Sequence, residues 1–461
     1  MPAQQKTRVE KAKKYTRSFP AEFLLTQEGD LWCKLCLTNV SSDRKSTVDK
    51  HRNSAGHQGK LKNCESQASI KNFNLSEKSF PHKVTIAFLA ADIPLYKLRH
   101  PALRKLFQDI GNPLPSEFVC RNIVKSIGES IESKIIQVLK EDNIFMVVDE
   151  AEINGKKIAH VLIGTIENPA EAFLIECIII GSSPNASMVC QIIDDVFKKT
   201  SIDRKRFILL LSDAAPYMIS AGKTLKNLFP RLFHVTCLSH LLHNCALKIK
   251  SKFQSADAII ATIKAATIKN KIREIDFSNI GKPPAPIVTR WGSWFEACLF
   301  YAKNLPLVRT IVNSWDGDGI LIRRAKEAVN DPDAANQLFQ IFKCYSEISK
   351  IIIKLESSEL GIAEAVELLN IDFKEDPCEI RKYISRRLES NDITPILKMQ
   401  NVLISPAEYS FLFKCQPTTA SVERSFSILG KLLQKDRNFN AENIKYYMLC
   451  LFNSSIISKL Y

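Results

Sequence analysis

The order of short apolar runs constrains this chain more than any other feature of the sequence. Three runs rich in β-branched residues follow one another at 144–148, 157–165 and 172–180, and Asn154–Gly155 lies between the first two. Such runs are typical of strands, and Asn-Gly is typical of a two-residue hairpin turn. The sequence therefore predicts three consecutive strands in an antiparallel meander.

The pattern then alternates between helix and strand. We expect helices at 188–199, 214–228 and 238–249, where apolar residues recur with helical spacing, and short buried strands at 207–211 and 232–235. Three strands followed by this alternation predict a mixed α/β sheet.

Helical patterns flank the sheet region on both sides. An amphipathic helix is expected at 118–140, and the sequence after Trp291 is helical, as in 338–355. The end of the chain predicts two further helices at 419–434 and 441–456. We therefore expect a helical region between the alternating segment and a closing C-terminal segment.

Positive charge is concentrated near the N-terminus. The net charge is +15, and residues 1–62 hold 13 Lys and Arg against six Asp and Glu. This excess indicates a polyanionic partner such as DNA. Because no apolar run reaches the roughly 18 residues of a membrane span and the start is polar and basic, we expect no membrane segment and no secretory signal. Thiols should then be reduced, and clustered cysteines are expected to bind metal.

Two cysteines and two histidines have the spacing of a zinc site. Cys33, Cys36, His51 and His57 follow the pattern C-x2-C-x14-H-x5-H. A CxxC turn presents two thiolates on one side, and two histidines at the end of a following helix complete a tetrahedron. Residues 18–62 are too few for a core of their own without such a metal. Chance occurrence of these residues in a loop is the alternative.

Basic residues lie beside these ligands. Arg44, Lys45, Lys50 and Arg52 fall on or near the helix expected to carry the histidines, and their side chains are of the kind that reach phosphates and guanine edges. Residues 1–17 are predicted to be a disordered basic arm that is either simply solvated or used for nuclear targeting or phosphate contacts. A finger can also bind protein, so a docking role stays open.

Two buried strands end in aspartate. Asp149 follows IFMVV and Asp213 follows FILLLS. If these strands are neighbours, the two carboxylates share one site, where they can hold Mg²⁺ for phosphodiester chemistry. Two alternatives remain: Asp213 caps the following helix, and Glu150 or Glu152 takes the place of Asp149.

Several long motifs resemble one family. The stretches LSDAAPYMISAGKTLKNLFPRLFHVTCLSHLLHN, VTRWGSW and TTASVERSFSILGKLLQKDRNFN occur in that order and resemble the core and the C-terminal dimerisation segment of hAT-superfamily DNA transposases. The N-terminal segment resembles a BED-type finger, and more closely the finger of the CGG-repeat-binding protein, which also has a counterpart of 91–107. Together these likenesses cover nearly the whole chain.

The resemblance implies a fold and a catalytic triad. The fold is a ribonuclease-H-like α/β core with a mixed sheet, interrupted by an all-helical insertion, with a small N-terminal zinc finger. The triad corresponds to Asp149, Asp213 and Glu423, which would hold two Mg²⁺ or Mn²⁺ ions. A solvated Glu423–Arg424 pair on a helix surface is the alternative for the third position.

Two further pairs follow from the same resemblance. Cys237 and His240 match the family's Cys-x-x-His pair, for which we expect a packing or DNA-positioning role. Arg290 and Trp291 match its Arg-Trp pair and are expected to contact DNA, the tryptophan by stacking on a base.

These predictions divide the chain into seven segments. The segments are a basic arm at 1–17, the finger at 18–62, a linker at 63–80, a helical connecting region at 81–140, the first part of the ribonuclease-H-like core at 141–290, the helical insertion at 291–405, and core closure with the dimerisation region at 406–461.

The sequence thus predicts a nuclear hAT-type transposase that binds double-stranded DNA, cleaves transposon ends and transfers strands. A homodimer or larger homo-oligomer is expected through the C-terminal region, with Phe426, Leu429 and Leu432 exposed toward the partner. The alternative is a domesticated, non-catalytic DNA-binding regulator. The insertion is short for the superfamily, which bears on oligomeric state and on full transposition.

Overall fold

The computed structural model describes residues 3–19, 22–26, 29–36, 38–54, 56–58, 79–139, 141–181, 183–268, 270–286, 292–356, 360–371, 373, 375–400, 412–433 and 441–454. The chain divides between Ile127 and Gly128 into a smaller N-terminal unit and a larger unit that ends at Phe452. In the described part of the chain, no helix combines the length and the apolar character of a membrane span.

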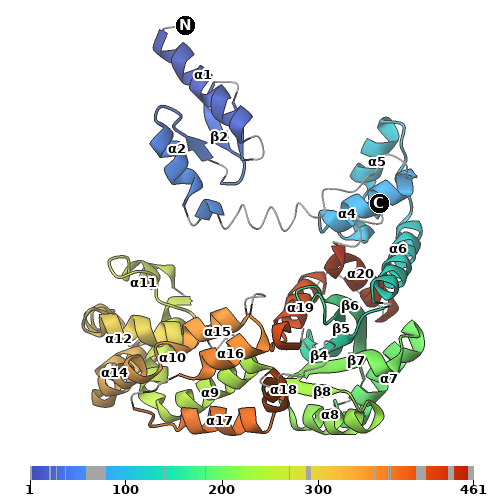
Figure 1. Cartoon of the computed structure of the whole chain (residues 1–461). Coiled ribbons are helices and arrows are strands. Elements are labelled where there is room, and N and C mark those ends of the chain that lie inside the picture. The colour runs from blue at the N-terminus through green and yellow to red at the C-terminus, as the bar shows by residue number, and fades with distance from the viewer. Residues whose placement is uncertain are drawn as a thin grey trace. The chain divides into compact units, whose positions relative to one another are not determined.

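The finger region is a small antiparallel sheet packed with two helices (Figure 1). Its elements are α1 (Ala3–Ser18), β1 (Phe23–Leu25), β2 (Leu31–Cys33), β3 (Thr38–Val40) and α2 (Lys45–Arg52). The buried core is small, with Phe23, Leu31 and Val48 at its centre. A core of this size stabilises little by itself, which agrees with the expectation that this region needs a metal.

The basic segment at the N-terminus is helical, so the prediction of a disordered arm at 1–17 is wrong. Val9, Ala12 and Tyr15 recur at intervals of three residues on one face of α1. Val9 lies against Gly29, Ala12 is fully buried, and Tyr15 packs on the finger core. The apolar spacing that predicts this helix is present in the sequence but is hidden by the many lysines around it.

Short helices follow in the rest of the smaller unit, within the region 81–140 that was expected to be helical. They are α4 (Phe80–Ala90), the 3-10 helix η1 (Leu95–Arg99) and α5 (Pro101–Asp109), and the long α6 (Glu117–Val138) then leads into the larger unit. Proline at the first turn of α4 and of α5 fits a position where no backbone N–H is needed.

A five-stranded mixed sheet forms the centre of the larger unit, with the strand order β6-β5-β4-β7-β8. Its strands are β4 (Ile144–Ile153), β5 (Lys156–Thr165), β6 (Phe173–Ile180), β7 (Phe207–Ser212) and β8 (Phe233–Thr236). The first three pair antiparallel, whereas β4 pairs parallel with β7, and β7 with β8. The predicted meander and the predicted mixed α/β sheet are both confirmed.

The hairpin between β4 and β5 is the predicted Asn-Gly turn. Asn154 and Gly155 have φ angles of 52° and 74°, both in the left-handed region. This is the backbone of a type I′ turn, which matches the twist of antiparallel strands and is open to asparagine and glycine. The turn fixes the register in which Asp149 lies opposite His160.

Helices cover both faces of the sheet (Figure 1). The covering helices are α7 (Ala186–Thr200), α8 (Pro216–Leu228), α19 (Ala420–Leu432) and α20 (Ala441–Phe452). On one face, His160 of β5 stacks on Phe426 of α19 with ring centroids 4.3 Å apart. On the other, His234 of β8 lies against Gly222 of α8.

The apolar positions of α19 face inward. Leu429 and Leu432 are fully buried, and Phe426 is half-buried against His160. The prediction that these three side chains are exposed toward a partner is therefore wrong, because they pack between α19 and the sheet of the same chain.

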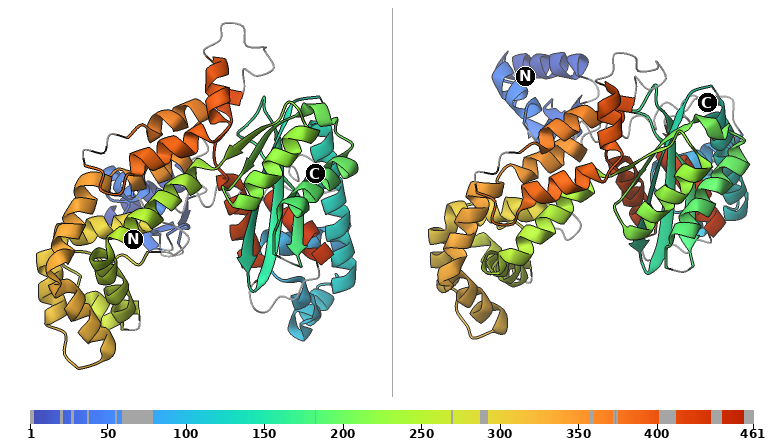
Figure 2. Two further views of the ribbon diagram at one scale, coloured as in Figure 1. Left: turned by 90° about the horizontal axis from the view of Figure 1, so that it is seen from below. Right: turned by 60° about the horizontal axis from the view of Figure 1, so that its bottom comes forward.

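A helical body extends to one side of the sheet, and α9 leads into it (Figure 2). Its helices are α9 (Leu238–Lys252), α10 (Gln254–Ile268), α11 (Lys271–Ile275), α12 (Gly292–Asn313), α13 (Ile320–Asn330), α14 (Pro332–Tyr345), α15 (Ile348–Glu356), α16 (Ile362–Leu369), α17 (Ile380–Glu389) and α18 (Ile393–Gln400). The helical region thus begins before residue 291, with α10 packed against α11 and against the later helices α12, α13 and α14.

We predict that Gly222→Ala destabilises the larger unit. A β-carbon at this position would lie 2.0 Å from Nδ1 of His234, whose Nε2 is held by the Ser212 hydroxyl at 2.9 Å. Overpacking of a core costs about 1–3 kcal/mol, and urea denaturation measures the loss. Gly430→Ala in α19 is the matched control, since nothing lies within 4 Å of its added β-carbon; an equal loss in both variants would contradict this packing.

Candidate functional site

Four side chains of the finger converge on one point. Cys33 ends β2, Cys36 lies in the following turn, and His51 lies in the last turn of α2 ahead of His57. Their ligand atoms lie within 4.8 Å of one another. The Nδ1 atom of His57 is 3.5 Å from Sγ of Cys33, 3.6 Å from Sγ of Cys36 and 3.2 Å from Nε2 of His51.

This donor set is one that zinc prefers. Two thiolates and two imidazoles are the ligands of Cys2His2 sites. Burial, followed by the neighbouring His57, lowers the pKa of His51, which favours the neutral imidazole that a metal needs. The N–H of Cys36 also donates to Sγ of Cys33 at 3.3 Å. The cluster predicted from the sequence therefore exists and can hold a zinc ion.

The basic residues predicted to contact DNA fall into two groups. Arg44, Lys45 and Lys50 are exposed at the start and along the surface of α2. Arg52 is different, because its guanidinium pairs with the carboxylate of Glu22, with nitrogen–oxygen distances of 2.7 and 2.8 Å. Three of the four side chains thus present their charge to solvent, and the fourth is engaged inside the finger.

The two predicted aspartates lie side by side at one edge of the sheet. The parallel pairing of β4 and β7 matches Val147 with Leu211. Two residues further along each strand are Asp149 and Asp213, and a step of two returns the side chain to the same face. Asp149 is 6% exposed. Oδ1 of Asp213 accepts a hydrogen bond of 3.1 Å from the N–H of Ala215, so it also caps the turn before α8.

The third acid arrives from the far end of the sequence. Glu423 lies in the first turn of α19, the helix that covers the face on which Asp149 lies. Burial, together with the charges of Asp213 and Glu423, raises the pKa of Asp149 to about 7, although His240 and a backbone N–H act in the opposite direction. Three acids from three separate segments therefore interact electrostatically at one site.

The three carboxylates do not converge as closely as the finger ligands do. Among the described residues, only the Cys33 cluster brings three such ligand atoms within 4.8 Å of one another. The acidic site is therefore wider than the shell of a single magnesium ion, whose ligand oxygens lie about 2.0–2.1 Å from the metal.

Cys237 and His240 hold the segment that carries Glu423. The N–H and the hydroxyl of Thr419 donate to Sγ of Cys237 at 3.2 and 3.4 Å, and the same hydroxyl is 3.3 Å from Nδ1 of His240. Cys237 in turn donates its N–H to the Ser212 carbonyl at 2.8 Å. A continuous chain of contacts thus runs from the end of β7 through the start of α9 to the turn before Glu423.

His240 is a positive charge among these acids. Burial by itself lowers its pKa, but the Cys237 side chain and then the carboxylates of Asp149 and Glu423 raise the pKa of His240 to about 10. In its protonated form, His240 offsets part of the negative charge of Asp149 and Glu423. The packing role expected for Cys237 and His240 is thus accompanied by an electrostatic one.

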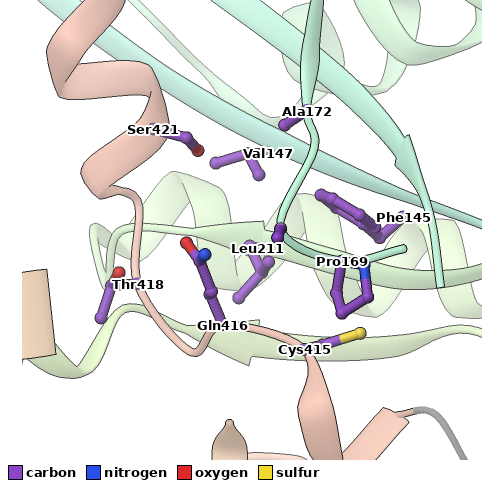
Figure 3. A pocket seen from close by; sticks show the side chains of 10 residues that line it. Phe145, Val147, Pro169, Ala172, Leu211, Cys415, Gln416, Thr418 and Ser421 are labelled. Atoms are coloured by element: carbon purple, nitrogen blue, oxygen red, sulfur yellow. The ribbon is translucent and has the colours of Figure 1, made fainter. Parts of the chain in front are cut away.

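A small hollow adjoins the acidic site on the same face of the sheet (Figure 3). Val147 and Leu211 form its floor, and Gln416, Thr418 and Ser421 of the closing segment line the opposite side. The apolar floor continues directly into the strand ends that carry the two aspartates. This surrounding of low polarity strengthens the coupling between the charges beside it.

Two further acids follow Asp149 on β4, and the charge of the first, Glu150, still couples to that of Asp213. Glu150 follows Asp149 on the strand and therefore faces the opposite side, where its Oε1 accepts a hydrogen bond of 2.7 Å from the Tyr217 hydroxyl of α8. Glu152 is exposed. Tyr217 was not anticipated, and only its position at the start of the helix after Asp213 signals it. Arg290 and Trp291 lie outside the described residues.

No family model matches the chain, and no curated protein shows significant similarity to it.

We predict that two buried histidines make the fold sensitive to acid. Burial lowers the pKa of His160 to about 3 and that of His234 to about 4, whereas an unfolded histidine titrates near about 6.5. Below that pH only the unfolded chain takes up these protons, so the free energy of unfolding should fall as the pH drops toward 4.

Urea denaturation at a series of pH values measures this effect. His160→Gln and His234→Gln should each reduce the slope by up to about 1.4 kcal/mol per pH unit. His100→Gln is the control, since His100 is exposed. Slopes that are the same in all variants would mean that neither histidine is kept neutral by the fold.

Proposed function

We propose that this protein is a DNA-binding phosphodiester-cleaving enzyme of the hAT transposase type, with a ribonuclease-H-like core in the nucleus. One observation carries the proposal: Asp149, Asp213 and Glu423, from three distant segments, interact at one edge of a mixed sheet. Acids that come together in this way, one of them buried, are suited to divalent cations, because a buried carboxylate is unfavourable unless a positive charge or hydrogen bonds satisfy it.

The donor set fits Mg²⁺ or Mn²⁺. Hard carboxylate oxygens from Asp149, Asp213 and Glu423 would hold the ions, and phosphodiester chemistry commonly uses a pair of ions about 3.5–4 Å apart. When bound, the ions supply activation of an attacking water or 3′-hydroxyl and stabilisation of the leaving oxygen. Burial and the neighbouring carboxylates raise the pKa of Asp149, and the charge of a bound cation would offset both effects.

The protein's own residues position and shield this chemistry. Cys237 and His240 fix the turn at Thr419, four residues ahead of Glu423. The apolar floor of Val147 and Leu211 limits water on one side of the acids. We expect Arg290 and Trp291 to contact DNA, the tryptophan by stacking on a base.

The finger would supply binding to double-stranded DNA. Zinc held by Cys33, Cys36, His51 and His57 would stabilise it. The exposed side chains of Arg44, Lys45 and Lys50 along α2 form a positive surface suited to phosphates. A homodimer or larger assembly through the C-terminal region remains part of the proposal, on surfaces other than the buried face of α19.

Asp213→Asn should abolish cleavage of a nicked or precut DNA end in Mg²⁺ or Mn²⁺ and leave DNA binding intact. The amide can still accept from the Ala215 N–H, so the fold is preserved while a metal ligand loses its charge. We expect a drop of roughly 100-fold or more in rate, measured by gel assay under single-turnover conditions.

Glu152→Gln is the matched control, because Glu152 is an exposed acid near the end of β4, the strand that carries Asp149. This variant should cleave normally. Cleavage that survives Asp213→Asn would overturn the metal assignment. DNA binding without cleavage by the unaltered chain would favour the alternative, a non-catalytic DNA-binding regulator.

The affinity for duplex DNA should fall steeply with salt. Each phosphate contact contributes about 0.9 to the slope of log affinity against log salt, so replacing Arg44, Lys45 and Lys50 together by glutamine should flatten the slope accordingly. Fluorescence anisotropy across a salt series measures it.

The control for that experiment is a triple glutamine variant of lysines in the larger unit. Lys198, Lys205 and Lys223 are exposed on or next to α7 and α8, away from the acidic face of the sheet. An affinity that does not depend on salt would instead favour a protein-docking role for the finger.

A further inference from the structure

The finger contains a buried acid, Glu22, to which the proposed function assigns no role. Glu22, immediately before β1, is 7% exposed. Its Oε2 lies 3.0 Å from Nε2 of His57, and both of its oxygens accept from the guanidinium of Arg52. An acid buried at this depth is unfavourable unless its oxygens are satisfied, and here they are satisfied by a metal-binding histidine and an arginine.

The geometry distinguishes the two nitrogens of His57. Its Nδ1 faces Cys33, Cys36 and His51, whereas its Nε2 faces Glu22. The nitrogen beside the carboxylate must carry the hydrogen, because a carboxylate only accepts. Nδ1 is then left with its lone pair directed at the metal position. Phe23 stacks on the ring of His57, with ring centroids 6.2 Å apart, and this contact also restricts the ring.

Glu22 is itself held from several sides. Its backbone carbonyl accepts a hydrogen bond of 2.8 Å from the N–H of Lys34, the residue after Cys33. The guanidinium of Arg52 lies 3.5 Å over the ring of Phe19 while it pairs with Glu22. The acid is therefore tied to the CxxC turn by its backbone and to the end of α2 by its side chain.

We propose that Glu22 is a positioning residue for the metal centre, and that Arg52 serves to hold Glu22 rather than to contact DNA. A metal-binding histidine commonly donates its other ring N–H to a carboxylate, which fixes the ring and makes the bound nitrogen a better donor. The inference rests on the proposed metal site of the finger and is independent of the acidic site of the larger unit.

The test uses the full-length chain and Co²⁺ as the probe, since thiolate-to-cobalt absorption reports binding directly. Glu22→Ala should weaken Co²⁺ and Zn²⁺ binding by about 10–100-fold in competition with a chelator. Glu22→Gln, whose amide oxygen can still accept from His57, should weaken binding less. Asp43→Asn, at an exposed acid of the same finger, is the control and should bind as the unaltered chain does.

A second readout separates positioning of His57 from general stabilisation of the finger. In the zinc-loaded chain labelled with ¹⁵N-histidine, the Nε2 proton of His57 should exchange slowly with water, because Glu22 holds it. That protection should be lost in Glu22→Ala and reduced in Arg52→Gln, which retains the carboxylate but no longer holds it in place. Arg52→Gln should also leave the salt dependence of DNA binding unchanged.

The outcomes are distinct. If the unaltered chain shows no thiolate-to-cobalt absorption, the metal centre itself fails and this inference fails with it. If the unaltered chain binds the metal and Glu22→Ala binds equally tightly with the same proton protection, only the role of Glu22 is overturned. A salt slope that falls by about 0.9 in Arg52→Gln would return Arg52 to the DNA-contacting surface.

Discussion

The parallel pairing of β4 with β7 is the constraint on which the candidate acidic site depends. It matches Val147 with Leu211, so the next residues on the same face of each strand are Asp149 and Asp213. A shift of one residue in this register would turn one aspartate to the other face. The side chains of β7 are buried on both faces of the sheet, and the Asn154–Gly155 turn sets the register of the neighbouring β4–β5 hairpin.

Closure of the site depends on contacts between segments that are far apart in the sequence. Cys237 receives two hydrogen bonds from Thr419 and gives one to the end of β7. The same segment begins α19, whose Phe426 and Ser425 pack on His160 of the sheet. The position of Glu423 is thus a consequence of packing on the sheet and of the sulfur-centred contacts at Cys237. The finger is stabilised differently. It has few buried side chains, so its structure depends mainly on the four metal ligands and on the Glu22–Arg52 ion pair.

Much of this architecture follows from local sequence. The strand runs, the Asn-Gly turn and the C-x2-C…H-x5-H spacing each depend on nearby residues, and all three are observed. The helical N-terminus was missed because lysines obscure the spacing of Val9, Ala12 and Tyr15. The inward face of α19 was missed because an amphipathic pattern does not say whether its partner is the same chain or another. Glu22 could not be found from spacing, since its contact with His57 joins residues that are distant in sequence.

The most direct test of the account is a count of divalent cations bound to the acidic site, made by Mn²⁺ electron paramagnetic resonance on the full-length chain. Hard manganese ions prefer carboxylates over the thiolates of the finger. We predict that the unaltered chain binds Mn²⁺ and that Glu423→Gln loses this binding while Glu152→Gln keeps it. Binding of Mn²⁺ that is unaffected by Glu423→Gln, or no binding at all, would contradict a shared metal site for the three acids.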